Sequence, residues 1–193
     1  MNELTFGFAM CGSYCTFDTV LDEMRKIAAK GYRLLPIMSE NASSTDTRFG
    51  RAKDFVWQVS DICGRDVITS IVGSEPIGPK KLADLMIVAP CTGNTLAKLA
   101  NGITATSVTM AVKSCLRIGI PIVLAPATND ALAVSAQNLG RLMNAKHIYF
   151  VPMQQDNPEE KPNSVVADFS LILPAALAAL KGEQLQPVWE RGK

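Results

Sequence analysis

The sequence predicts an α/β fold, a single-domain doubly wound (Rossmann-like, flavodoxin-like) parallel sheet with helices on both faces. Short apolar runs alternate with segments whose apolar residues recur at helical spacing, which is the pattern of parallel strands joined by crossover helices. The chain has 193 residues, of which 48% are hydrophobic, enough for one well-packed core. We therefore expect one domain over residues 1–181 and a loosely held C-terminal tail over 182–193.

Each expected strand is a short run of apolar residues bounded by turns. These runs lie at residues 5–10, 32–38, 85–89, 122–125 and 148–151. The segments with helical spacing span residues 17–28, 51–63, 95–100, 107–118, 130–143 and 165–180. Polar loops are expected over 39–47 and 152–163. The run at 85–89 is apolar at every position, which indicates a strand that is buried on both faces.

Charge and composition exclude several classes of function. Lys and Arg number 19 against 18 Asp and Glu, so the sequence offers no electrostatic basis for binding nucleic acid. No apolar stretch approaches the roughly 20 residues of a membrane span, and the first residues lack the features of a signal peptide. We expect a cytoplasmic protein with no membrane partner. Because only 19% of residues are charged, we also expect apolar surface to be covered in a homo-oligomer.

The cysteines and the single histidine do not suggest a metal site. Five cysteines occur without a Cys-x-x-Cys pair, and His147 is the one histidine, so we expect neither bound metal nor structural disulfides. Cys11 and Cys15 lie near an expected helix start, where the helix dipole favours a thiolate. The alternative, which we favour, is that they are small apolar residues in a tight turn.

The residues that follow the expected strands form one chemical set. Ligands of open parallel sheets bind outside the carboxyl ends of the strands. The residues there are rich in hydroxyl and amide groups and poor in charge, and the candidates are Gly12, Ser13, Ser39, Pro90, Thr92, Asn94, Thr95 and Asn129. Such groups suit FMN, held by neutral hydrogen bonds with its phosphate near Gly12 and Ser13. Turn and helix-cap roles are the alternative for each residue taken alone.

Other nucleotides are not supported by the first loop. It lacks the Gly-x-Gly-x-x-Gly of a dinucleotide fold and the Gly-Lys-Ser/Thr of a nucleoside triphosphatase. The sequence therefore favours FMN over NAD or ATP as the ligand of this chain.

Two segments resemble the paired signatures of a known family. Residues 83–102, ADLMIVAPCTGNTLAKLANG, and residues 121–129, PIVLAPATN, are similar to signatures of the flavoprotein family that contains the homo-oligomeric flavin-containing cysteine decarboxylases. The resemblance spans most of residues 4–151 and implies the fold, the FMN site and a homo-oligomer, a trimer or a multiple of trimers. The family's decarboxylases place a catalytic histidine near the flavin. Here His147 lies just before the last expected strand, which argues against decarboxylation.

Three further segments resemble one branch of this family. Residues 43–50, 73–80 and 161–164 are similar to the branch in which a flavoprotein-like chain works together with a second, different subunit. That similarity implies conversion of dihydrodipicolinate to dipicolinate in the mother cell of a sporulating bacterium. It also implies that NAD(P) binds the partner rather than this chain. The alternatives are a flavin-dependent decarboxylase of a small acid and a non-catalytic subunit that binds FMN or serves as a scaffold.

A small dicarboxylate substrate requires cationic or dipolar partners in the site. Arg48 follows the second expected strand and offers a bidentate guanidinium, so we expect it to bind a carboxylate. The alternative is an ion pair with Asp46 or simple solvation. Asn129, which we expect at the flavin edge, is the second catalytic candidate.

Overall fold

The computed structural model describes residues 4–190 and contains a seven-stranded sheet. The strands lie in the order β2-β1-β3-β4-β7-β6, and β5 pairs with the first half of β4. Their bounds are β1 Thr5–Met10, β2 Arg33–Met38, β3 Leu85–Cys91, β4 Ile122–Thr128, β5 Ile148–Phe150, β6 Met153–Gln154 and β7 Val165–Ala167. Strands β1 to β5 are parallel, whereas β6 and β7 add an antiparallel pair.

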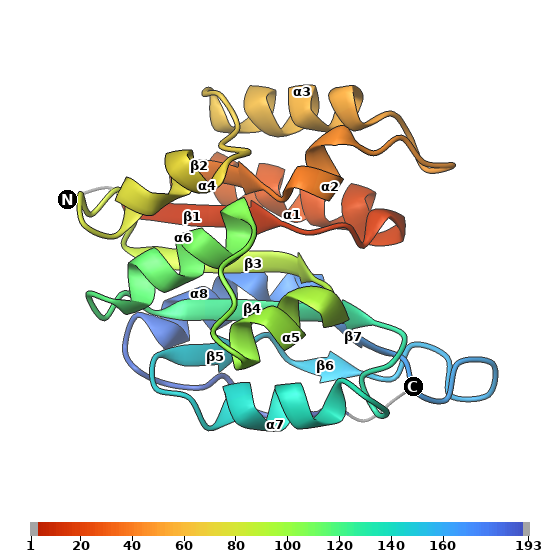
Figure 1. Ribbon diagram of the computed structural model, residues 1–193. Helices are drawn as coiled ribbons and strands as arrows, with labels where there is room; N and C mark the ends of the chain where they lie inside the picture. The colour runs from red at the N-terminus through yellow and green to blue at the C-terminus, as the bar shows by residue number, and fades with distance from the viewer. Residues whose placement is uncertain (1–3, 191–193) are drawn as a thin grey trace.

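Helices cover both faces of this sheet (Figure 1). Helices α1 (Phe17–Ala29) and α8 (Ile172–Ala179) lie on one face, and α5 (Gly93–Ala100), α6 (Ser107–Leu116) and α7 (Ala136–Met143) lie on the other. The α-helices are α1 Phe17–Ala29, α2 Glu40–Ser44, α3 Ala52–Cys63, α4 Ile71–Ser74, α5 Gly93–Ala100, α6 Ser107–Leu116, α7 Ala136–Met143 and α8 Ile172–Ala179. Short 3-10 helices are η1 Tyr14–Thr16, η2 Glu75–Ile77 and η3 Phe169–Leu171. The predicted doubly wound fold is confirmed.

The core is the sheet and the apolar faces of the helices that cover it. Every residue of β3 is buried, as its uninterrupted apolar sequence predicts. Helix α1 turns Phe17, Leu21 and Met24 into the core, and the Phe17 ring meets Phe55 of α3 edge-on with 4.9 Å between centroids. The loops after β1 and β2 start from strands that are paired in parallel along their whole length.

Two predicted helices begin later than expected. The segment predicted as a helix from residue 165 starts with β7, whose Val165 and Val166 pair antiparallel with Thr128 and Ala127. These β-branched residues favour a strand, and β7 covers the exposed end of β4. The helix predicted from residue 130 begins at Ala136, because the Asp130 carboxylate binds nearby hydroxyls and stabilises a turn instead.

The segment after Gly182 is held more firmly than the sequence suggests. The Gln184 side chain exchanges hydrogen bonds of 2.8 and 2.7 Å with the backbone N–H and carbonyl of Phe150. The backbone N–H of Met153 donates to the Val188 carbonyl, and Glu190 N–H donates to the Met153 carbonyl. The expectation of a loosely held tail is therefore not met for residues 184–190, and residues 191–193 lie outside the described part of the chain. None of the helices within 4–190 has both the length and the hydropathy that a membrane span requires.

Candidate functional site

The strand order places a crevice between the carboxyl ends of β1 and β3. Strand β2 pairs with one side of β1, and β3, the next strand along the chain, pairs with the other side. The strand order therefore reverses between β1 and β3, and open parallel sheets bind ligands at such a switch point. The Cys11 N–H donates to the Pro90 carbonyl at 3.2 Å and ties the two strand ends together. Two adjoining cavities, of about 660 and 730 Å³, open at this edge. We refer to them as the first and the second cavity.

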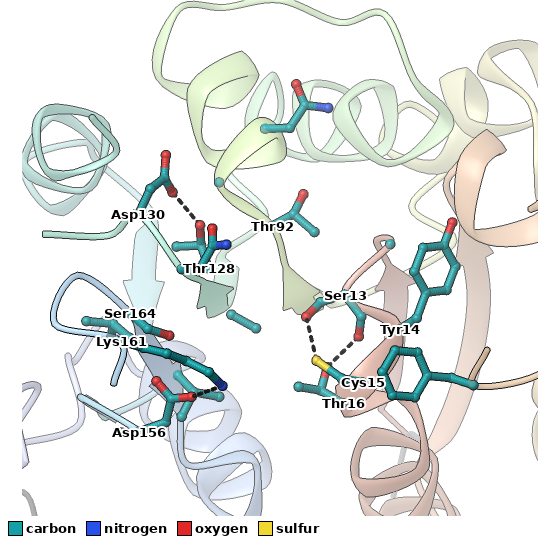
Figure 2. A pocket seen from close by; sticks show the side chains of 18 of the residues that line it. Ser13, Tyr14, Cys15, Thr16, Thr92, Thr128, Asp130, Asp156, Lys161 and Ser164 are labelled. Carbon is teal, nitrogen blue, oxygen red and sulfur yellow. Dashed lines mark hydrogen bonds and ion pairs between the residues drawn. The ribbon is translucent and has the colours of Figure 1, made fainter. Parts of the chain in front are cut away.

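The first cavity is lined by five segments that lie at or after the ends of different strands. Figure 2 shows Ser13 to Thr16 on one wall, Thr92 and Thr128 toward the back, and Asp156, Lys161 and Ser164 on the opposite wall. The charged side chains that line it are Arg48, Asp130, Asp156 and Lys161. The cavity therefore combines hydroxyl groups with two cations and two carboxylates.

The second cavity lies between α2, α5 and the N-terminus of α6. The Glu40 carboxylate faces this cavity, and its Oε1 accepts a 2.9 Å hydrogen bond from the Ser107 N–H. Its Oε2 is buried and has no hydrogen-bond partner within residues 4–190. Because a buried carboxylate oxygen without a donor is unfavourable, this atom is suited to a ligand hydroxyl. Tyr14 lies between the two cavities and donates to the Asn41 carbonyl at 2.9 Å.

All but one of the predicted cofactor residues line these cavities. Gly12, Thr92 and Asn94 line both, Ser39 and Thr95 line the second, and Ser13 and Asn129 line the first. Pro90 lines neither, because it is buried within β3. The alternative role as helix caps is real as well, since Ser39 and Thr92 accept hydrogen bonds from the N–H groups of Ala42 and Thr95.

Arg48 lines the first cavity, as expected for a carboxylate-binding residue. Its guanidinium carbon lies 4.8 Å from the centroid of the Phe49 ring. The carboxylate of Asp46, the alternative partner, instead accepts a 2.8 Å hydrogen bond from the Ala52 N–H at the start of α3. Arg48 thus lines the first cavity, while the Asp46 carboxylate binds a backbone N–H group.

Asp130 is a site residue that the sequence analysis missed. Its Oδ1 accepts hydrogen bonds from the hydroxyls of Thr128 and Ser135, the latter at 2.9 Å. A Cβ built on Gly93 would lie 2.6 Å from Thr128 Oγ1 and 2.8 Å from Asp130 Oδ1, so glycine leaves room for this cluster against the first turn of α5. The signal available in the sequence was the polar triplet at residues 128–130, directly after a strand.

The pair of Asp156 and Lys161 was also missed. Lys161 Nζ lies 3.6 Å from Asp156 Oδ2. Burial raises the pKa of the Asp156 carboxyl, but the hydrogen bond from Ser164 and the charge of Lys161 lower it further, so the pKa lies below its usual value. Nothing local in the polar loop predicted at 152–163 shows that it folds over the first cavity, because that position follows from the pairing of β7 with β4.

The thiols near the site behave differently from each other. Burial raises the pKa of Cys11 to about 11, although a hydrogen bond from Thr95 opposes the shift. Cys11 is therefore a protonated, buried residue that packs in the turn, in line with the favoured alternative. Cys15, in contrast, is exposed at the first cavity. His147 is far from the cavities, since its carbonyl binds the Ile122 N–H where β4 begins. Residues 4–190 contain no group of three or more His, Cys, Asp and Glu side chains arranged to bind a metal.

Comparison with known proteins agrees with the geometry. The Flavoprotein family model matches residues 1–172. The chain is 43% identical over 182 residues to the B subunit of dipicolinate synthase from Bacillus subtilis (strain 168), covering 94% of this chain and 91% of that protein. The crystal structure of the corresponding B subunit from Bacillus halodurans C superposes with a TM-score of 0.90 at 39% identity over the full length of both chains.

A more distant structure shares the fold. The FMN-dependent cysteine decarboxylase SpaF superposes with a TM-score of 0.67 at 20% identity, covering 92% of this chain and 97% of that one. The family match covers most of the chain and agrees with the parallel sheet and the cavities at its switch point. The chain therefore belongs to the Flavoprotein family.

Proposed function

We propose that this chain is the flavin-binding subunit of a two-subunit oxidoreductase that converts dihydrodipicolinate to dipicolinate. The observation that carries the proposal is the 43% identity to the B subunit of dipicolinate synthase across nearly the whole chain. Its partner would be the A subunit of dipicolinate synthase, which would bind NAD(P), in the cytoplasm of the mother cell of a sporulating bacterium. The cavities at the switch point support the proposal, because together they offer space for a cofactor and a small acid.

The residues of the two cavities fit FMN. Ribityl hydroxyls are donors that would satisfy the orphaned Oε2 of Glu40, which lines the second cavity. In this proposal Gly12 and Ser13 hold the phosphate, and the amides of Asn94 and Asn129 hold the polar ring edge. When bound, FMN supplies a two-electron acceptor beside the first cavity.

The reaction removes one hydride and one proton from the dihydropyridine ring and leaves an aromatic product. Asp130 is placed to take the proton, because Thr128 and Ser135 bind its Oδ1 and orient Oδ2 as the remaining acceptor. FMN, or NAD(P)+ on the partner, would supply the two-electron acceptor that the hydride requires. Arg48 would bind and orient one substrate carboxylate, so the ring is held at the mouth of the crevice.

Self-association is part of the proposal, as a trimer or a multiple of trimers. Large apolar side chains remain uncovered on the single chain, notably Val72 at 80% and Val134 at 71% exposure. These side chains have exposed apolar neighbours in the chain, Ile71 beside Val72 and Leu132 near Val134, and contiguous exposed apolar surface is typical of surfaces that are buried on association.

Spectroscopy of the purified chain tests the cofactor and the activity together. We expect visible absorption of bound oxidised flavin, bleaching of that absorption when dihydrodipicolinate and the partner are added, and an oligomeric mass in light scattering. Bound flavin that is never reduced would favour the scaffold alternative, and release of carbon dioxide from a small acid would favour a decarboxylase. Absence of flavin after reconstitution with FMN would contradict the cofactor assignment.

Replacing Arg48 by Lys should weaken substrate handling without affecting the fold. Lysine keeps the charge but loses the bidentate guanidinium, so we expect KM of the two-subunit enzyme to rise by about tenfold. Flavin content and thermal unfolding should be unchanged, since Arg48 is exposed. Steady-state kinetics over a substrate series measures the change. A wild-type KM in this variant would remove Arg48 from the site.

A further inference from the structure

Two cations reach the first cavity from opposite ends of the strand order. Arg48 lies in the segment between α2 and α3, next to edge strand β2, and Lys161 lies between β6 and β7 at the other side of the sheet. Figure 1 shows both segments projecting beyond the same edge, where the strands end. Within the described chain, Arg48 and Lys161 are the lysine and arginine side chains that line this cavity.

The backbone around Lys161 is braced. The Lys161 N–H donates to the Asn157 carbonyl at 2.8 Å, and the Lys161 carbonyl accepts from the Ser164 N–H at 2.9 Å. The Gln155 amide donates to the Pro162 carbonyl at 2.8 Å. The Asn163 carbonyl accepts a 3.1 Å hydrogen bond from the Leu132 N–H in the turn after β4. The segment is thus attached to the turn that carries Asp130, and Lys161 begins from a defined position at the cavity wall.

Asp156 restricts the position of the Lys161 ammonium but does not occupy all of its hydrogen-bond donors. The single contact of 3.6 Å uses one of the three ammonium donors, so two remain for a ligand. Ser164, which is only 6% exposed, forms a hydrogen bond with the Asp156 side chain and so holds that carboxylate from the other side. An ion pair with this much exposure contributes little to stability, so stability alone is a weak explanation for the arrangement.

We propose that Lys161 binds the second carboxylate of the substrate, opposite the carboxylate bound by Arg48. The inference rests on the proposed function, which requires a dianion in the first cavity. Two carboxylates leaving water need two cationic partners, and Arg48 provides one. Asp156 positions the Lys161 ammonium. The negative charge of Asp156 repels a carboxylate that does not contact Lys161. The pair of cations makes the site selective for a ring with two carboxylates over a ring with one.

Binding of the aromatic product and of a matched monocarboxylate separates this role from catalysis. Dipicolinate is pyridine-2,6-dicarboxylate, and picolinate is the same ring with one carboxylate removed. We expect calorimetry on the full wild-type chain to show dipicolinate binding at least tenfold more tightly than picolinate. In Lys161→Gln, and equally in Arg48→Gln, the ratio of the dipicolinate affinity to the picolinate affinity should fall to within about twofold of unity. In either variant each ligand has only one cation available.

Lys161→Arg should keep most of the wild-type preference for dipicolinate over picolinate, since arginine keeps the charge and adds donors. The matched control is Lys146→Gln, because Lys146 is exposed next to His147 at the far edge of the sheet and lines neither cavity. The ratio of the two affinities in this control should equal that of the wild type. A wild-type ratio in Lys161→Gln, or an equal loss of affinity for both ligands, would overturn the role of Lys161. If the wild type binds neither ligand, the proposed function itself fails, which is a different result.

Discussion

Asp130→Asn should lower the turnover of the two-subunit enzyme by about 10²- to 10⁴-fold, the usual contribution of a general base. Asparagine has nearly the same shape, and its amide oxygen can still accept from Thr128 and Ser135, so the turn at residues 130–135 should persist. What the variant loses is a group that can take the proton released as the ring becomes aromatic. Steady-state assays of dipicolinate formation should show this loss in kcat, with KM changed by less than about threefold.

A matched exchange elsewhere tests whether the effect is specific. Asp61 is exposed on α3 and lines neither cavity, so Asp61→Asn should retain wild-type kinetics. Flavin absorption and thermal unfolding of Asp130→Asn should match those of the wild type, which would separate lost chemistry from lost structure. Turnover within threefold of the wild type would show that Asp130 is not the proton acceptor.

Gly78→Ala should destabilise the protein by about 3 kcal/mol, the upper range for added volume in a packed core. A Cβ built on Gly78 would lie 1.8 Å from the backbone carbonyl oxygen of Ser114 in α6, and a backbone atom cannot rotate away as a side chain can. The Gly78 N–H also donates to Ser114 Oγ at 2.7 Å, while that hydroxyl donates to the Glu75 carbonyl. Separating α6 from η2 would break both hydrogen bonds. Urea unfolding followed by circular dichroism measures the lowered midpoint.

The control for Gly78 is a glycine with free space around it. A Cβ on Gly140, within α7, would meet nothing within 4 Å. Because alanine favours a helix more than glycine does, Gly140→Ala should stabilise the protein by up to about 1 kcal/mol. Opposite signs for two chemically identical substitutions would show that the contact with Ser114 decides the effect. Equal stability of Gly78→Ala and the wild type would contradict the close packing of η2 on α6.

The edge of the sheet where the two cavities open was predictable because the relevant signals are local. The run at 85–89 is apolar throughout and forms the central strand β3, while hydroxyl and amide residues follow it directly. In a parallel sheet the residues after each strand meet at one edge, so Gly12, Ser39 and Thr92 come together without knowledge of their contacts. Pro90 is the exception among the predicted residues, because β3 continues through it to Cys91 and it lines neither cavity.

The charged wall of the first cavity depends on contacts between distant parts of the chain. Asp130 was assigned to a helix, since helical spacing in the sequence does not reveal that its carboxylate prefers Thr128 and Ser135. Lys161 reaches the first cavity only because β7 reverses direction and pairs with the end of β4. The buried Glu40 Oε2 arises where α2 meets the start of α6, two elements separated by more than sixty residues.

By itself, then, the sequence determined the parallel sheet and the polar residues at the carboxyl ends of its strands, because strand burial and the turns after strands are encoded in short segments. The tertiary structure decided which charged groups face the first cavity, together with the antiparallel extension and the attachment of residues 184–190. The physical reason is that an unpaired strand end must be covered, and whichever distant segment covers it determines the side chains placed beside the ligand.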